Sequence, residues 1–246
     1  MPVTSTLTTI NITRIADPTL DFSLISGLET LTISGSVVPV TITLPNVYTN
    51  LSVFTIQNID IPIIDISNYI NLEQINFSNT DVETLLLPNS TTLTRVTIRN
   101  HNLQGTHNFA SLSNLDRLTI TNNENTPLLI DVSQNLALTE IDLSSNDMTI
   151  LDITQNVLLE QIDVSDNEFT TIDLTQNVLA ENINVSSNNL PTLNVTQNVL
   201  LEYLYASNNL LPNLDVTNNV ELRQLIISNN LFTTTGLDLT ENVELN

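Results

Sequence analysis

The sequence predicts a mainly β solenoid, in which the chain winds into about eleven stacked coils with short parallel strands on two faces. Three observations predict this fold. One 21-residue line is written twice in succession, its period extends over nearly the whole chain, and each unit holds two short alternations of apolar and polar residues.

The doubled line is the clearest signal of a repeat. "LTEIDLSSNDMTILDITQNVL" begins at Leu138 and "LEQIDVSDNEFTTIDLTQNVL" begins at Leu159, and both follow the pattern LxxLxLxxNxLxxLDLxxNxx. Units spaced by 21 to 23 residues begin at Leu7, Leu28, Leu51, Leu72, Leu93, Leu115, Leu138, Leu159, Ala180, Leu201 and Leu222, and Leu245 opens a partial twelfth. We therefore expect a lead-in over residues 1–6 and a single domain over residues 7–246.

Each unit contains two segments with the two-residue period of a strand. Ile141 and Leu143 form the first apolar pair of one unit, and Leu151 and Ile153 form the second. Side chains between the paired residues point to the opposite side of the strand. Stacking the units places equivalent strands side by side, about 4.8 Å apart, so that the apolar pairs form one continuous core.

Two asparagine columns complete the pattern from Leu115 onward. The first column is Asn123, Asn146, Asn167, Asn188, Asn209 and Asn230, and the second is Asn135, Asn156, Asn177, Asn198, Asn219 and Asn242. These residues and spacings resemble the leucine-rich repeats, in particular the 21-residue bacterial and viral class, and the resemblance implies a right-handed coil. We expect the asparagines to be buried and to bond to the turn backbone of their own and adjacent coils.

The first five units depart from the asparagine columns. The first slot holds Ile15, Ser36, Ile59, Thr80 and His101, and the second holds Ile25, Tyr48, Tyr69, Ser90 and Leu112. We expect packing to hold these coils in place of an asparagine ladder.

Composition excludes several classes of function. The net charge is -22, with 27 acidic residues against five arginines and no lysine. Such a polyanion repels phosphate backbones and anionic lipids, so we expect neither a nucleic-acid partner nor membrane insertion. The chain has no cysteine, no run of 18 apolar residues and no secretory signal pattern in its first 20 residues.

Little in the sequence points to catalysis. His101 and His107 are the only histidines, the chain has only four glycines, and neither a phosphate-binding loop nor a nucleophile elbow is present. We expect a protein that is not an enzyme and needs no cofactor.

Two clusters on the first strand are candidate binding sites. Tyr203, Tyr205 and Ile226 are expected to point outward as an exposed apolar patch, unless a terminal cap or loop covers them. Arg95, Arg99, His101 and Arg117 gather basic residues on two adjacent units as an anion-attracting surface, although Glu140 offers Arg117 an ordinary ion pair.

The second strand carries a row of acids, each two residues before Ser or Thr. Its candidate metal ligands are Asp152, Asp173, Asp215 and Asp238, and Asp131 and Asn194 occupy the same position. Calcium bridging neighbouring carboxylates is one interpretation. Hydrogen bonding of each side chain to the following turn is the favoured one, and an ice-binding threonine face is a distant third.

Loops and ends suggest contacts beyond the strand faces. Extra residues within "SGSVVPVTI", "TNNENTPLLI" and "SNNLFTTTGL" lie at one corner of the coil, as a docking edge or as tolerated loop growth. Uncapped terminal coils would expose apolar surface that another copy, another subunit or further sequence covers.

The sequence as a whole favours a non-enzymatic structural or adhesive scaffold in a larger extracellular assembly, with a virion or phage tail component as the favoured setting. It would act by binding a protein partner or by self-association through its ends. The alternative is a free-standing bacterial recognition module that binds protein or glycan through its strand face.

Overall fold

The computed structural model describes residues 7–17, 19–23, 25, 27–36, 40–43, 50–123, 128–233 and 236–245. All regular secondary structure in these ranges is β, and the prediction of a parallel-strand solenoid is confirmed. The chain forms two compact units, one mainly from Met1–Gln104 and the other mainly from Pro127–Asn246, with short exchanges between residues 105 and 126. The prediction of a single domain stays a prediction.

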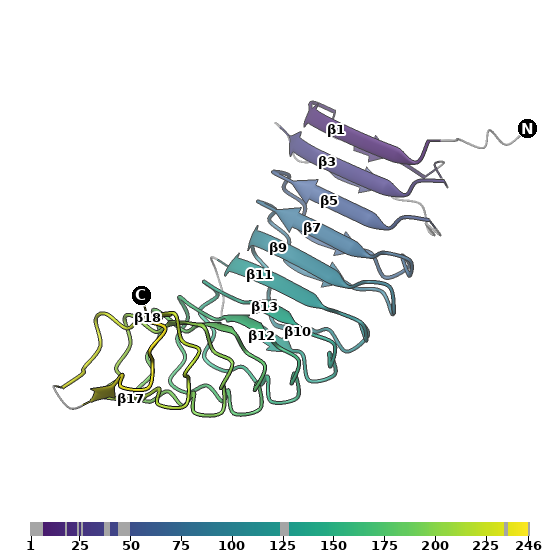
Figure 1. The fold of residues 1–246 in the computed structure, drawn as a ribbon. Helices are drawn as coiled ribbons and strands as arrows, with labels where there is room; N and C mark the ends of the chain where they lie inside the picture. Colours follow the sequence, from purple (N-terminus) through teal and green to yellow (C-terminus); the bar gives the residue numbers. More distant parts are fainter. Residues whose placement is uncertain are drawn as a thin grey trace, which may run out of the picture. The chain divides into compact units, whose positions relative to one another are not determined.

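The first unit stacks long first strands in chain order, as the purple-to-teal arrows of Figure 1 show. Their bounds are β1 (Thr9–Ile15), β3 (Thr30–Ser36), β5 (Val53–Gln57), β7 (Gln74–Ser78) and β9 (Arg95–His101). Neighbours pair in parallel without a shift in register, for example Phe54 opposite Ile75 and Ile75 opposite Val96. Equivalent repeat positions are therefore direct neighbours in space.

The second unit continues the pattern with three-residue first strands. They are β13 (Glu140–Asp142), β14 (Gln161–Asp163), β15 (Asn182–Asn184), β16 (Tyr203–Tyr205) and β18 (Gln224–Ile226). Their central residues, Ile141, Ile162, Ile183, Leu204 and Leu225, lie opposite one another along the stack. β11 (Arg117–Asn123) carries residues of both units.

In the described part of the chain, the strands of the second face form four parallel pairs. The pairs are β2 (Thr19–Asp21) with β4 (Thr41–Thr43), β6 (Ile63–Asp65) with β8 (Thr84–Leu86), β10 (Thr106–Asn108) with β12 (Leu129–Asp131), and β17 (Leu214–Asp215) with β19 (Leu237–Asp238). Segments 149–153, 170–174 and 191–195 form no strand, although the repeat pattern predicted one in every coil. Single backbone bonds, such as Glu168 N–H to the Met148 carbonyl at 2.8 Å, link these coils instead.

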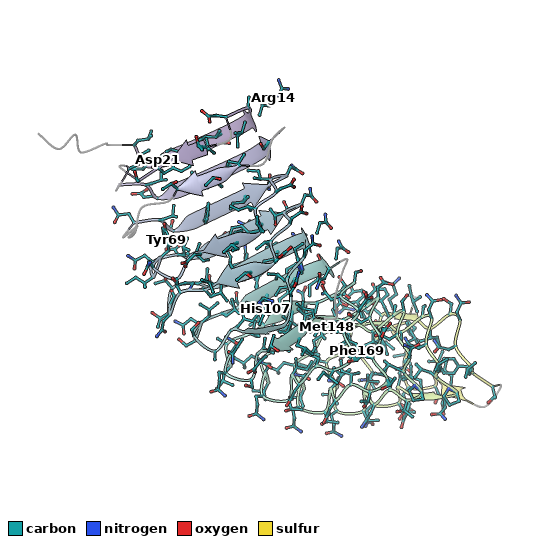
Figure 2. All side chains as sticks on the ribbon, turned by 180° about the vertical axis from the view of Figure 1, so that it is seen from behind. Arg14, Asp21, Tyr69, His107, Met148 and Phe169 are labelled. Carbon is teal, nitrogen blue, oxygen red and sulfur yellow. The ribbon has the colours of Figure 1, made fainter. Side chains whose placement is uncertain are left out.

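The asparagine columns of the second unit form ladders and are buried, as predicted, except that Asn230 at the end of the first column is half-buried. In the first column, the Asn167 amide donates to the Leu143 carbonyl of the preceding coil at 2.9 Å, and Asn167 Oδ1 accepts from Met148 N–H at 2.8 Å. In the second column, Asn177 Nδ2 donates to the carbonyls of Ile153 and Asn156 at 3.1 and 3.0 Å. Met148 and Phe169, labelled in Figure 2, are buried beside the first column.

The first unit has an asparagine ladder too, which corrects the expectation that packing alone holds it. The ladder lies one residue before the predicted slot and is exposed. Asn79 Nδ2 donates to Asn58 Oδ1 at 2.7 Å, Asn100 donates to Asn79 in the same way, and Asn122 donates to Asn100 at 2.8 Å. All four have φ between 51° and 59°, a left-handed conformation that asparagine tolerates better than most residues.

Packing also contributes in the first unit, as expected. Ile15, Ile59 and Thr80 fill the first slot and are buried. At the second slot, Ser90 replaces an asparagine amide, because its hydroxyl donates to the Ile70 carbonyl at 2.8 Å. Tyr48 and the extra residues 37–39, 124–127 and 234–235 lie outside the described part of the chain.

Candidate functional site

The strongest candidate surface is the aromatic patch of Tyr203, Tyr205 and Ile226 on the first-strand sheet. Tyr203 and Tyr205 flank the buried Leu204 in β16, so both side chains point away from the core. Parallel pairing places Tyr205 directly opposite Ile226, which is 38% exposed. The structure thus brings together the three residues that the sequence selected.

A hydrogen bond and an ion pair connect the residues in and beside the aromatic patch. The Tyr205 hydroxyl donates to Gln224 Oε1 at 2.8 Å, which ties it to the next coil. Arg223 Nη1 lies 2.6 Å from Glu202 Oε2. A hydrogen bond with the Tyr203 side chain, and then the charge of Glu202, raise the pKa of Arg223. The surface therefore joins two rings, a branched aliphatic side chain and a fixed guanidinium.

The predicted basic cluster is only partly a surface. Arg95 and Arg99 alternate with buried Val96 and Ile98 on β9, and their side chains lie on the outer face. His101 is 1% exposed, which corrects its assignment to that surface. It occupies the first asparagine slot, which points into the coil, and its Nδ1 accepts from Leu103 N–H at 3.1 Å.

Arg117 belongs to the second unit and has acidic partners of its own. Its Nη1 lies 2.9 Å from Glu140 Oε2, and its Nε lies 3.4 Å from Asp116 Oδ2. Both pairs are solvent-exposed, where an ion pair contributes little stability. The ion pair between Arg117 and Glu140 that the sequence suggested is confirmed.

The side chains of the acidic row, on the second face of the coils, each bond to the turn that follows. Oδ1 of Asp152 accepts from Thr154 N–H at 3.0 Å and from Thr154 Oγ1 at 2.7 Å. The same two bonds form at Asp131, Asp173, Asn194, Asp215 and Asp238. No group of three or more potential metal ligands occurs among the residues described. The predicted hydrogen bonding of each side chain to the following turn, called here the turn lock, is confirmed, and calcium binding stays a hypothesis.

Acid titration tests the turn lock. The hydroxyl bond from the following Ser or Thr is the first of the effects that lower the pKa of Asp131, Asp152, Asp173 and Asp215. A carboxyl with a lowered folded-state pKa stabilises the fold above the ordinary aspartate pKa, about 3.9, and loses that contribution as pH falls through its folded-state value.

A variant with Asp152→Asn, Asp173→Asn and Asp215→Asn should therefore lose less stability than the wild type between about pH 6 and pH 3. Asn194 shows that an uncharged amide oxygen accepts both turn bonds. Urea unfolding midpoints at both pH values measure the effect. Equal losses in the two proteins would mean that these carboxyls do not carry the acid sensitivity.

No described segment forms a helix of the length and apolar character needed to span a bilayer. No protein-family model matches the chain, and no curated protein matches it by sequence.

Solved structures do match the fold. The functional domain of InlJ from Listeria monocytogenes aligns with a TM-score of 0.75 and 23% identity over 93% of this chain, and the chain spans 57% of that structure. The InlJ domain includes a cysteine ladder, whereas this chain has no cysteine. The leucine-rich-repeat protein LIC12759 of Leptospira interrogans aligns with a TM-score of 0.57 and 15% identity, covering 91% of this chain and 78% of that one.

An internalin, InlF, from Listeria monocytogenes aligns with a TM-score of 0.51 and 16% identity over 91% of this chain and 81% of that one. At these identities the matches concern the fold alone. Together with parallel strands at 21-residue spacing and buried asparagine ladders, they show that the chain has the leucine-rich-repeat fold.

Proposed function

We propose that this chain is a non-enzymatic protein-binding scaffold that contacts its partner through the aromatic patch on its first-strand sheet. The observation that carries the proposal is the alignment of Tyr203, Tyr205 and Ile226 on adjacent strands, next to Arg223. Tyrosine and arginine are enriched at the centres of protein interfaces, because they bury large areas and keep a polar group for hydrogen bonding.

The patch is organised before any partner binds. Tyr205 bonds to Gln224 and Arg223 pairs with Glu202, so these side chains already favour one arrangement and lose less entropy on binding than unpaired ones would. The strands beneath are tied coil to coil by the asparagine ladders. A rigid sheet face with fixed aromatic rings suits recognition of a folded protein surface.

An extracellular assembly, and a virion or phage tail in particular, remains our proposal for the setting. It rests on composition: a chain with no lysine and five arginines offers few sites to trypsin-like proteases, and its acidic charge favours solubility. The similarity of fold to an internalin of Listeria monocytogenes is compatible with this setting and with the bacterial recognition alternative.

The test is comparative capture from the extracellular fraction of the source culture, followed by affinity measurement with the purified partner. The variant Tyr203→Ser, Tyr205→Ser, Ile226→Ser should lose at least about 100-fold in affinity, because central aromatic residues each contribute about 1 to 2 kcal/mol or more. The control variant Ile63→Ser, Leu86→Ser removes exposed apolar side chains from the second face of the first unit and should bind as the wild type does. A partner that binds all three proteins equally would exclude the patch as its site.

Self-association is a second candidate function. Leu225, Ile227 and Leu237 stand at core positions of the repeat but are partly exposed, and with Leu239 and Leu245 they border a hollow of about 440 Å³. Another copy or subunit that covers this hollow would remove apolar surface from water. Light scattering behind size exclusion over a hundredfold concentration range distinguishes the cases: growth with concentration supports assembly, and a constant mass near 27.2 kDa opposes it.

A further inference from the structure

The second unit carries a row of exposed apolar side chains that neither the core nor the aromatic patch uses. The row, called here the turn stripe, follows the second buried asparagine of each coil. Its members are Leu136, Val157, Leu158, Val178, Val199, Leu200, Val220 and Val243, and each is between 41% and 80% exposed. Exposed apolar rows of this kind mark interaction sites more often than isolated surface leucines do.

The turn stripe is continuous because hydrogen bonds link each of its turns to the turn of the preceding coil. From Asn156 onward, each second-column asparagine donates to the backbone carbonyl of the equivalent asparagine one coil earlier. The distances are 3.0 Å from Asn177 to Asn156, 2.8 Å from Asn198 to Asn177 and 2.7 Å from Asn219 to Asn198. Valines that directly follow these asparagines therefore recur once per coil, at about the 4.8 Å coil spacing, as an apolar ridge.

Folding of the coil does not require apolar residues at these positions. In the first unit the equivalent positions hold Thr91, Thr92, Ser113 and Asn114, and the coils close normally around the buried Ser90 and Leu112. Ile70 is apolar at its position, but Asn71 follows it. Apolar residues in coil after coil of the second unit therefore point to a use outside the fold.

Carboxylates border the turn stripe along the coil on both sides. Glu160 and Glu181 stand three residues after Val157 and Val178, and both are exposed. Asp152 and Asp173 stand five residues before the same valines and are also exposed. An apolar ridge between two acidic rows complements an apolar surface bordered by cations.

This charge pattern decides between two occupants of the turn stripe. A second copy of the chain would bring its own carboxylates against these rows, in a protein of net charge -22. Arg223 has the same repeat position as Glu160 and Glu181. Its Nη1 lies 2.6 Å from Glu202 Oε2, so this guanidinium is already paired and does not offset the repulsion. A basic partner gains attraction where a second copy meets repulsion.

We propose that the turn stripe is a second docking surface, and that its occupant is a basic amphipathic polypeptide segment with apolar side chains on one face and lysine or arginine beside them. The proposal does not rest on the aromatic patch, because the two surfaces share no residue. A helix rises about 5.4 Å per turn, close to the coil spacing of about 4.8 Å, so its apolar face can follow several coils.

The probe is a fluorescein-labelled peptide of about 14 leucines and lysines whose leucines form one helical face, long enough to cover about four coils. Fluorescence anisotropy against the full chain should show saturable binding that weakens with salt. The variant Val157→Ser, Val178→Ser, Val199→Ser keeps every charge and should bind at least tenfold more weakly. The control Ile63→Ser, Leu86→Ser, Leu129→Ser removes the same number of exposed apolar side chains elsewhere and should bind as the wild type does.

A second variant, Glu160→Gln with Glu181→Gln, leaves the ridge intact and should weaken binding and reduce its salt dependence. A peptide with glutamate in place of lysine should not bind. Equal binding by the wild type and the serine variant, or no binding by the wild type, would overturn the proposal. Concentration-dependent self-association that the serine variant abolishes would also overturn it, because the occupant would then be a second copy. Loss of binding by the tyrosine variant to its own partner has no bearing on these outcomes.

Discussion

Replacing Asn167 by alanine is expected to lower the free energy of unfolding by about 3 kcal/mol or more. Asn167 donates to the carbonyls of Leu143 and Val164 at 2.9 and 3.1 Å, and its Oδ1 accepts from the backbone N–H groups of Asn146 and Met148. Alanine leaves the two N–H groups buried without this acceptor, and each such group costs about 1 to 3 kcal/mol.

The loss should be far larger than that of an exposed asparagine with similar bonds. Asn194 accepts from Thr196 N–H and Thr196 Oγ1 at 3.1 and 2.8 Å, but water replaces these bonds when Asn194 becomes alanine. We expect the control Asn194→Ala to cost about 1 kcal/mol or less. Urea unfolding of the three proteins gives the comparison, and equal losses would show that the ladder contributes no more than a surface turn.

The asparagine ladders also show what periodicity can predict. A column of asparagines that recurs every 21 residues within an apolar pattern requires a buried, regularly spaced partner, and the backbone of the neighbouring coil is the available one. The exposed ladder of Asn58, Asn79, Asn100 and Asn122 was equally visible as a column. It was missed because the pattern was aligned on the leucine-rich-repeat slot, and the adjacent column lies one residue outside it.

His101 marks the limit of reading a residue type without its slot. As a basic residue near Arg95 and Arg99, His101 was predicted to lie on their surface. Its repeat position, however, points into the coil, where its Nδ1 accepts a hydrogen bond from Leu103 N–H. The slot decides orientation, because side chains at one repeat position share one direction in every coil. The same rule predicted the positions of Tyr205 and Ile226 correctly.

Two further features depend on backbone detail that periodicity does not contain. Second-face strands require paired backbone bonds between successive coils, and the side-chain pattern does not decide where these bonds form, because Asp131 and Asp215 make the same turn bonds within β12 and β17 as Asp152 makes outside any strand. The exposure of the valines in the turn stripe depends on how tightly the turn closes after Asn156 and Asn177. Sequence alone shows that these valines recur, but not that water reaches them.

Replacing Phe54 by alanine is expected to destabilise the first unit by about 3 to 5 kcal/mol. Phe54 is 1% exposed, and its ring meets that of Phe77 edge to face, with centroids 5.6 Å apart and planes at 83°. Among the described residues of the first unit, Asn123 alone continues the buried asparagine columns, so apolar packing between coils carries a larger share of the stability of this unit. Thermal or urea unfolding with a probe in the first unit measures the loss.

A double-mutant cycle separates the ring contact from the simple burial of area. Phe54→Leu keeps most of the volume and should cost clearly less than alanine, about 1.5 kcal/mol or less if neighbours repack. Phe54→Ala and Phe77→Ala together should cost less than the sum of the two, with a coupling of about 0.5 to 1.5 kcal/mol, because each loses the same edge-to-face contact. Strict additivity would mean that each ring is stabilised by its own coil. Coupling would mean that the contact between Phe54 and Phe77 stabilises the stacking of their two coils. In the first unit this aromatic contact would then play the part that buried asparagine amides play in the second.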